Sequence, residues 1–258
     1  MKILGIESSA LVASVAIWED GVITAEYTVN FKKTHSQTLL PMIDEIFRMT
    51  EQDKDSIDAI AIAAGPGSFT GLRIGSATAK GLGLAWNVPL ISVPTLDAMA
   101  YQCFDTVSTI CPIMDARRNQ VYNGMYEWES GEFIIKVPSR AVDMDQVIAE
   151  VNELGGPVIF LGDGVPAQLK NIYANVQVPF YLAPAHLNRQ RGAAVAALGA
   201  QMYADGIYES AEAHAPEYLR SSQAERVRGE KQEEQSGQSS VEAEIEKAEA
   251  GIVVKSYT

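Results

Sequence analysis

The first third of the chain alternates between β-type runs and helical periods. Residues 2–8, 12–18 and 22–29 are short runs rich in apolar and β-branched residues. The Asp20-Gly21 pair between the last two runs is a hairpin signal. These features predict a three-stranded meander at the start of the fold.

The next segment changes from an alternating pattern to a helical one. Over residues 35–53 apolar residues recur every three or four positions, which predicts a helix that tolerates Pro41 only near its start. The periodic positions are Leu39, Leu40, Ile43, Ile46 and Phe47. They cover an arc too wide for one buried face, so deep burial and a protein–protein surface both explain them.

Strands and helices then alternate up to residue 104, and a second meander follows. The predicted elements are a strand over 58–65, a helix over 70–86, a strand over 89–93, a helix over 94–104, strands over 108–116, 120–128 and 132–142, a helix over 142–154, a strand over 157–164 and a helix over 191–206. A meander followed by α/β units predicts a mixed sheet with helices on its faces. The order is that of an actin-like, ribonuclease-H-like lobe.

This pattern divides the chain into three predicted parts. Residues 1–104 form an N-terminal lobe and residues 105–220 a second, smaller lobe. The helix over 191–205 is expected to pack back on the body, with the first lobe as one candidate. Residues 221–258 are rich in Glu and poor in large apolar residues, and we expect an acidic, flexible tail.

Composition narrows the function classes. The formal net charge is −13, and binding RNA phosphates directly requires clustered Lys and Arg, so any contact with RNA is expected to pass through a partner. Cys103 and Cys111 do not have the spacing of a metal or redox motif and suit a reducing cytoplasm. No apolar run reaches the length of a membrane span.

The most distinctive motif is "AAGPGSFTGLRIG" at residues 63–75. It fits neither the Walker A nor the Rossmann phosphate loop, because no Lys follows and Gly71 is out of register. It therefore predicts a strand-to-helix turn, with unusual φ angles at Gly65 and Gly67 and a helix cap from Ser68 or Thr70.

Small residues then recur every four positions along the helix that follows this turn. They are Gly71, Gly75, Ala79 and Gly83. Such a stripe allows another backbone to approach closely, either from the chain's own sheet or from a partner.

Two turns are candidates for a nucleotide site. Glu7, Ser8 and Ser9 lie between the first two strands, where actin-like ATPases place a phosphate loop, although those enzymes usually carry Asp. Gly162, Asp163 and Gly164 form a second candidate turn. His35, His186 and His214 are too far apart in sequence to indicate a metal site, and His35 is expected to be a cap or surface residue.

Several segments together resemble the TsaB (YeaZ) family. They are "ILGIESSALVASVAI", "HSQTLLPMI", "GPGSFTGLRIG", "AKGLG", "MDARRNQVY", "GDG" and "PEYLR". The resemblance covers residues 2–220 and implies two actin-like (ASKHA) lobes with mixed sheets. It implies a subunit that binds a TsaD-like catalytic subunit and supports threonylcarbamoylation of N6 of adenosine 37 in tRNAs that read ANN codons, with a TsaE-like ATPase as a further partner.

The same resemblance assigns roles to residues. TsaD-like proteins hold a catalytic metal with a His-x-x-x-His pair, and this chain has Thr95 and Met99 there. Neither suits a hard metal ion, so a non-catalytic subunit without metal or cofactor is expected, with ATP, ADP and metal bound by its partners. The pairing helices would be 35–50 and 70–86, through the five residues of the first helix and Gly71, Leu72, Gly75 and Ala79, in a complex with TsaD or in a homodimer. The alternative is an ATP-dependent actin-like kinase or hydrolase that uses Glu7.

Overall fold

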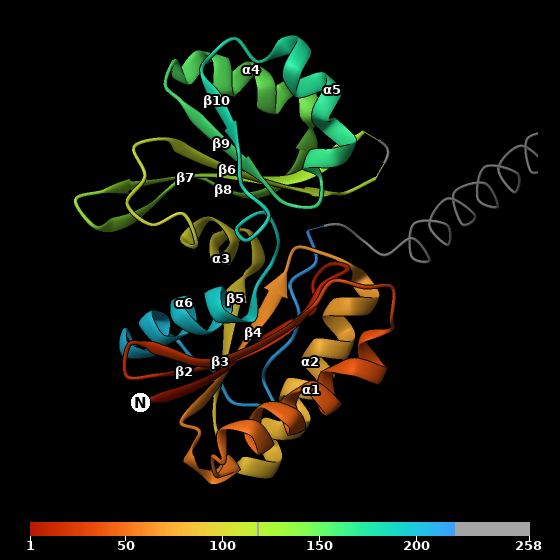
Figure 1. The fold of residues 1–258 in the computed structure, drawn as a ribbon, viewed down its shortest axis with the longest axis vertical. Helices are drawn as coiled ribbons and strands as arrows, with labels where there is room; N and C mark the ends of the chain where they lie inside the picture. The colour runs from red at the N-terminus through yellow and green to blue at the C-terminus, as the bar shows by residue number, and fades with distance from the viewer. Residues whose placement is uncertain (118, 220–258) are drawn as a thin grey trace, which may run out of the picture. The chain divides into compact units, whose positions relative to one another are not determined.

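The computed structural model describes residues 1–117 and 119–219 (Figure 1). The predicted acidic tail over 221–258 lies outside these residues. The first elements are β1 (Lys2–Glu7), β2 (Ala13–Glu19), β3 (Val22–Val29), α1 (His35–Thr50), a 3-10 turn (Lys54–Ser56), β4 (Ala59–Gly65), α2 (Phe69–Trp86), β5 (Leu90–Pro94) and α3 (Thr95–Tyr101). Every strand and helix predicted in this part is present.

The first sheet has the strand order β3-β2-β1-β4-β5. β1 pairs antiparallel with β2 and parallel with β4. Both faces of β1 are buried, because Leu4 and Ile6 pack with α1 on one side while Ile3 packs with a later helix on the other. This explains why β1 and β4 are continuous apolar runs rather than alternating ones.

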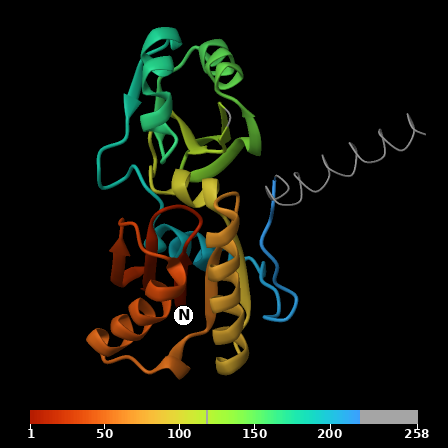
Figure 2. The same cartoon turned by 90° about the vertical axis from the view of Figure 1, so that its right-hand side faces the viewer.

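Helices cover both faces of this sheet. α1 and α2 lie side by side on one face (Figures 1 and 2), where the rings of Phe47 and Trp86 meet edge to face at 5.7 Å. The other face is covered by α6 (Gly192–Ala204), which contacts β1, β2 and β4. β1 and α6 approach closely, because a Cβ at Gly5 of β1 would lie 2.8 Å from the backbone nitrogen of Ala196 in α6. Such a close approach requires small residues on α6.

The second sheet has the order β10-β9-β6-β7-β8 and repeats the topology of the first. Its meander is antiparallel, and β9 and β10 add parallel to it. α4 and α5 cover one face, and α3 packs on the other. The elements are β6 (Thr109–Asp115), β7 (Gln120–Glu129), β8 (Glu132–Asp143), α4 (Met144–Leu154), β9 (Val158–Leu161), α5 (Val165–Asn175) and β10 (Phe180–Leu182).

Two elements of this part were not predicted, α5 and β10. α5 buries only one side chain fully, that of Ile172, and therefore has a weak apolar period. β10 has three residues, which is shorter than a recognisable strand pattern.

The repeated sheet order, with helices on the faces of both mixed sheets, is the actin-like, ribonuclease-H-like α/β fold. This confirms the predicted fold class. Within the described residues, no helix combines the length and the apolar character needed to cross a bilayer.

Candidate functional site

The glycine-rich turn connects β4 to α2 and holds the loop after β1. The Ser68 hydroxyl accepts a hydrogen bond from Gly71 N at 3.3 Å, so Ser68 caps α2, one of the two predicted caps. Ser68 N donates to Ser9 O at 2.6 Å. Gly65 has φ +129°, as predicted, but Gly67 has no positive φ. Gly67 is needed instead for space, because a Cβ there would overlap Ser9.

The small-residue stripe of α2 packs against the chain's own loop and sheet. A Cβ at Gly71 would overlap the Ser8 carbonyl oxygen, and one at Gly75 would overlap the Ser8 hydroxyl. The Ser8 hydroxyl donates to Gly71 O at 3.0 Å. A Cβ at Gly83 would lie 3.0 Å from Leu90. In this structure the stripe therefore brings α2 against the β1–β2 loop.

Most residues predicted for the partner interface lie in the chain's own core. Eight of the nine are buried: Leu39, Ile43, Ile46, Phe47, Gly71, Leu72, Gly75 and Ala79. Leu40 is 53% exposed. A surface formed by α1 and α2 would therefore have to use other side chains than those eight.

The outer face of α1 and α2 combines small, apolar and charged residues. The exposed residues are Ser36, Gln37, Leu40, Pro41, Asp44, Arg48 and Met49 on α1, and Thr70, Arg73, Ala77, Gly81, Leu84 and Ala85 on α2. We call this set the outer face. Ala77, Gly81 and Ala85 form a second small-residue stripe with a spacing of four, and a Cβ at Gly81 would meet no atom within 4 Å.

Glu7 ends β1 as a buried carboxylate. It is 1% exposed, and it accepts a hydrogen bond from Ser9 N at 2.6 Å. The pKa of Glu7 is raised to about 7: burial is the main cause, the hydrogen bonds of Ser9 and Ser8 oppose it, and the charge of Asp163 adds to it.

Asp163 lies on the predicted turn Gly162–Gly164, which follows β9 of the second sheet. Gln190 Nε2 donates to its carboxylate at 3.3 Å. Burial raises the pKa of Asp163, and Arg189 acts in the opposite direction. The charge of Asp163 is also one of the causes that raise the pKa of Glu7, which links the two predicted turns electrostatically.

Thr95 and Met99 lie on α3, between the two sheets. Thr95 is fully buried, and its hydroxyl has no hydrogen-bond partner among the described residues. Met99 packs in the apolar cluster under the second sheet. Within residues 1–117 and 119–219, no group of three His, Cys, Asp or Glu side chains is arranged to hold a metal ion.

His35 differs from the expectation of a surface or capping residue. It is 8% exposed, and its Nε2 lies 2.7 Å from Ala10 O, in the loop after β1. Thr34 is the residue at the cap position of α1, and it makes no side-chain capping bond. His35 therefore contacts the same loop that Ser68 holds.

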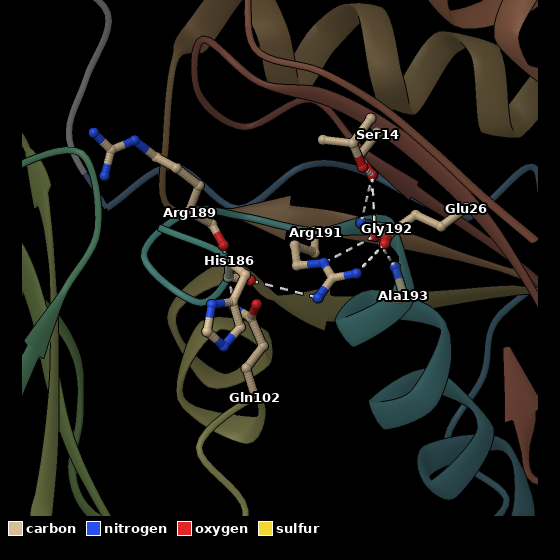
Figure 3. Close-up of polar contacts among 9 residues, drawn as sticks. Ser14, Glu26, Gln102, His186, Arg189, Arg191, Gly192 and Ala193 are labelled. Atoms are coloured by element: carbon tan, nitrogen blue, oxygen red, sulfur yellow. Dashed lines mark hydrogen bonds and ion pairs between the residues drawn. The ribbon is translucent and has the colours of Figure 1, made fainter. Parts of the chain in front are cut away.

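The segment that returns from the second sheet to α6 is held by a polar network (Figure 3). Arg191 forms an ion pair with Glu26 of β3, and Ala193 N donates to Glu26 at 3.1 Å. Gly192 N donates to the Ser14 hydroxyl at 2.9 Å. Glu26 thus neutralises Arg191 and accepts a hydrogen bond from the first turn of α6. The sequence around Glu26 does not indicate this role.

The residues after α6 add a further contact that sequence analysis missed. Leu90 N donates to Glu209 O at 2.9 Å, which extends the edge of the first sheet beyond β5. The carboxylate of Glu209 accepts from Ser92 at 2.6 Å and lies 2.9 Å from His214 Nδ1. Ser92 and Glu209 both meet the same ring nitrogen, so the three side chains do not form a nucleophile–base relay.

The "PEYLR" motif follows this segment. Tyr218 packs against Phe69 with ring centroids 4.6 Å apart and the ring planes tilted by 34°, and Arg73 Nε donates to the Tyr218 hydroxyl at 3.2 Å. Glu217 N donates to Ala64 O at 2.8 Å. The motif thus fastens the end of the described chain to the glycine-rich turn.

Comparison with known proteins agrees with these features. Residues 23–226 match the family described as "TsaD: tRNA N6-adenosine threonylcarbamoyltransferase". The chain is 30% identical over 227 residues to the "tRNA threonylcarbamoyladenosine biosynthesis protein TsaB" of Bacillus subtilis, which covers 87% of this chain and 96% of that protein. It is 32% identical over 167 residues to the protein of the same name from Escherichia coli, covering 64% and 72% of the two chains.

A solved structure of a YeaZ protein has a similar fold. "YeaZ from Pseudomonas aeruginosa" superimposes with a TM-score of 0.72 at 25% identity, over 84% of this chain and 99% of that one.

Proposed function

Given that the chain belongs to the TsaB (YeaZ) family of tRNA threonylcarbamoyladenosine biosynthesis, we propose that it is a non-catalytic subunit that binds a TsaD-type catalytic subunit. In this role it supports the transfer of a threonylcarbamoyl group to N6 of adenosine 37 in tRNAs that read ANN codons. A TsaE-type ATPase is the further partner, and a homodimer is the competing use of the same surface.

The observation that carries this proposal is the chemistry of Thr95 and Met99 on α3. Thr95 and Met99 stand where the catalytic relatives are expected to have histidines, and both side chains are buried. A hydroxyl and a thioether in an apolar environment are poor ligands for a hard cation. The chain matches the TsaD family over residues 23–226, and a supporting role fits these residues better than catalysis.

The outer face of α1 and α2 is our candidate contact with the catalytic subunit. Leu40 and Leu84 are more than half exposed, and Ala77 and Gly81 on α2 allow close approach of another helix. Arg73 and Arg48 add positive charges to this surface. The acidic chain as a whole, with net charge −13, favours contact with tRNA through its partner.

Co-purification with the TsaD-type subunit tests this assignment. Leu40→Asp places a charge on the outer face, and we expect it to abolish co-purification while leaving the fold intact. Leu154→Asp is the matched control, because Leu154 is 48% exposed on α4 of the second sheet. If Leu40→Asp retains the partner as well as the control does, the outer face is not the interface.

A second candidate function rests on the two carboxylates at the sheet ends. The charge of Asp163 acts on the buried Glu7, and acidic groups from both sheets would be expected in a protein that uses a nucleotide between its lobes. In that case the isolated chain would hydrolyse ATP, and Glu7→Ala would remove the activity. We favour the subunit role, so we expect no turnover above that of a buffer control.

A further inference from the structure

The N-terminal ends of α1 and α2 meet at one end of the first sheet. Cδ2 of His35, the first residue of α1, lies 3.3 Å from the position that a Cβ would take on Gly71, in the first turn of α2. At the other ends of the two helices, the rings of Phe47 and Trp86 meet. The helices therefore run parallel, side by side (Figures 1 and 2), and the positive ends of both macrodipoles lie together.

The chain leaves polar groups unsatisfied at this end. The first turns of α1 and α2 contain no acidic residue, and Thr34 makes no side-chain capping bond to α1. The side chain of His35 is buried, and its Nδ1 has no hydrogen-bond partner among the described residues. Backbone amides at such a helix start favour an anion.

Three cations without a carboxylate partner lie around the same helix ends. Lys32 and Lys33 are exposed in the loop between β3 and α1, and Arg73 is exposed on α2, two residues after Gly71. Within residues 1–117 and 119–219, none of the three forms an ion pair. Six other cations do: Lys2, Arg48, Lys54, Lys136, Arg140 and Arg191. In a chain with net charge −13, unpaired cations gathered at one end favour an anionic partner there.

Aromatic side chains accompany these cations. Phe31 directly precedes the two lysines and is 65% exposed. The guanidinium of Arg73 lies 3.9 Å from the ring centroid of Phe69 and donates to the hydroxyl of Tyr218, which is 40% exposed. Glu217, next to Tyr218, is exposed and opposes the positive charge in part. We call the following set the basic end: Phe31, Lys32, Lys33, Arg73 and Tyr218.

We propose that the basic end contacts the backbone of tRNA while the outer face holds the catalytic subunit. The two lysines pair with phosphates, and Phe31 stacks on an unpaired base. Arg73 belongs to both surfaces and marks where they adjoin. The inference rests on the proposed function, because the acidic chain meets tRNA only within the complex, where the basic end adds to the contacts of the catalytic subunit.

The composition of the basic end favours RNA over an acidic protein surface. Interfaces between proteins are depleted in lysine, whereas cations beside exposed aromatic rings are typical of surfaces that hold unpaired RNA. Lys32 and Lys33 lie on an exposed loop, within two residues of His35 at the start of α1. Two residues of chain span about 7 Å at most, so phosphates held by the lysines lie beside the positive helix ends.

Binding of tRNA by the complex of this chain with the TsaD-type subunit tests the proposal. Affinity is measured from about 50 to 200 mM salt, where phosphate contacts determine the salt dependence. We expect the double change Lys32→Ala and Lys33→Ala to weaken binding at least about tenfold at about 100 mM salt and to lower the slope of log K against log salt by about 2. We expect Phe31→Ala to weaken binding about fivefold without changing the slope, because stacking releases no counterions.

A matched control removes the same charge elsewhere. Lys136 on β8 and Lys170 on α5 are also exposed, and the double change Lys136→Ala and Lys170→Ala is expected to bind tRNA as wild type. The affinity of each chain for the catalytic subunit is measured without tRNA and is expected to be unchanged. Circular dichroism shows that each variant is folded.

The outcomes separate this inference from the proposed function. If no complex forms with the wild-type chain, the proposed function fails and this inference fails with it. If the complex forms but the Lys32 and Lys33 change alters neither affinity for tRNA nor the slope, or if the control loses as much, only this inference is overturned. Loss of the catalytic subunit by the same variant would also overturn it, since the basic end would then be a protein interface. Wild-type affinity in Phe31→Ala would refute the stacking contact.

Discussion

Replacing Gly71 by Ala tests whether the small-residue stripe of α2 serves the chain's own packing. A Cβ at this position would fall inside the 3.0 Å that real Cβ atoms keep from other atoms, and the atom it meets is the backbone oxygen of Ser8. The Ser8 backbone cannot rotate away as a side chain can, because the next residue, Ser9, accepts a hydrogen bond from Ser68 N. α2 or the loop after β1 must therefore shift.

The magnitude follows from two opposing effects. Overpacking costs about 1–3 kcal/mol, and the upper part of that range applies because backbone is hit. Ala gains about 1 kcal/mol over Gly in a helix interior. The net loss is about 2 kcal/mol, which lowers the melting temperature by about 4–8 °C for a chain of this size.

Gly81→Ala is the matched control on the same helix. Its Cβ meets no atom within 4 Å, so the helix gain of about 1 kcal/mol remains, and the melting temperature should rise by about 2–4 °C. Both variants are measured by thermal unfolding of the isolated chain, followed by circular dichroism. A Gly71→Ala chain that melts with or above wild type would refute the packing argument.

Three further predictions concern stability. Glu7→Gln should change the pH dependence of the free energy of unfolding. Because the pKa of Glu7 is raised in the folded chain, its contribution to wild-type stability is full below pH 4.5 and is lost as pH rises through about 7, a loss of up to about 3 kcal/mol relative to the variant. Urea unfolding at pH 4.5 and pH 8 measures this difference. The same change in the free energy of unfolding between pH 4.5 and pH 8 in both chains would contradict this. Leu39→Asp buries a charge at a site that is 1% exposed and should prevent folding, whereas Leu40→Asp should unfold with wild type, as circular dichroism would show. Glu26→Ala removes the acceptor of Ala193 N and the partner of Arg191, and should lower the free energy of unfolding in urea by about 2 kcal/mol. An unchanged free energy of unfolding would contradict this.

Local patterns predicted most of the elements because they depend on near neighbours in sequence. The Asp20-Gly21 turn, the apolar run of β4 and the cap at Ser68 all lie where they were expected. The helix α5 was missed because its packing face is narrow, with Ile172 as its fully buried residue. The two sheets share a topology that no repeat in the sequence indicates.

The candidate site depended on contacts between distant residues, and there the predictions were less complete. The stripe at Gly71 and Gly75 correctly indicated close approach, but periodicity alone could not say that Ser8 would fill the space. The wide apolar arc of α1 left burial and an interface equally open, and Leu39 and Ile43 turned out to be core residues. Glu7 and Asp163 are 156 positions apart, and no spacing rule relates them.

The central claim is that this chain supports catalysis by another subunit. The most direct measurement is the formation of threonylcarbamoyladenosine in tRNA by the TsaD-type subunit with its TsaE-type ATPase, with and without this chain. We predict product when the chain is present, little when it is omitted or replaced by Leu40→Asp, and none from the chain alone. Equal product without the chain, or product from the chain by itself, would contradict the account.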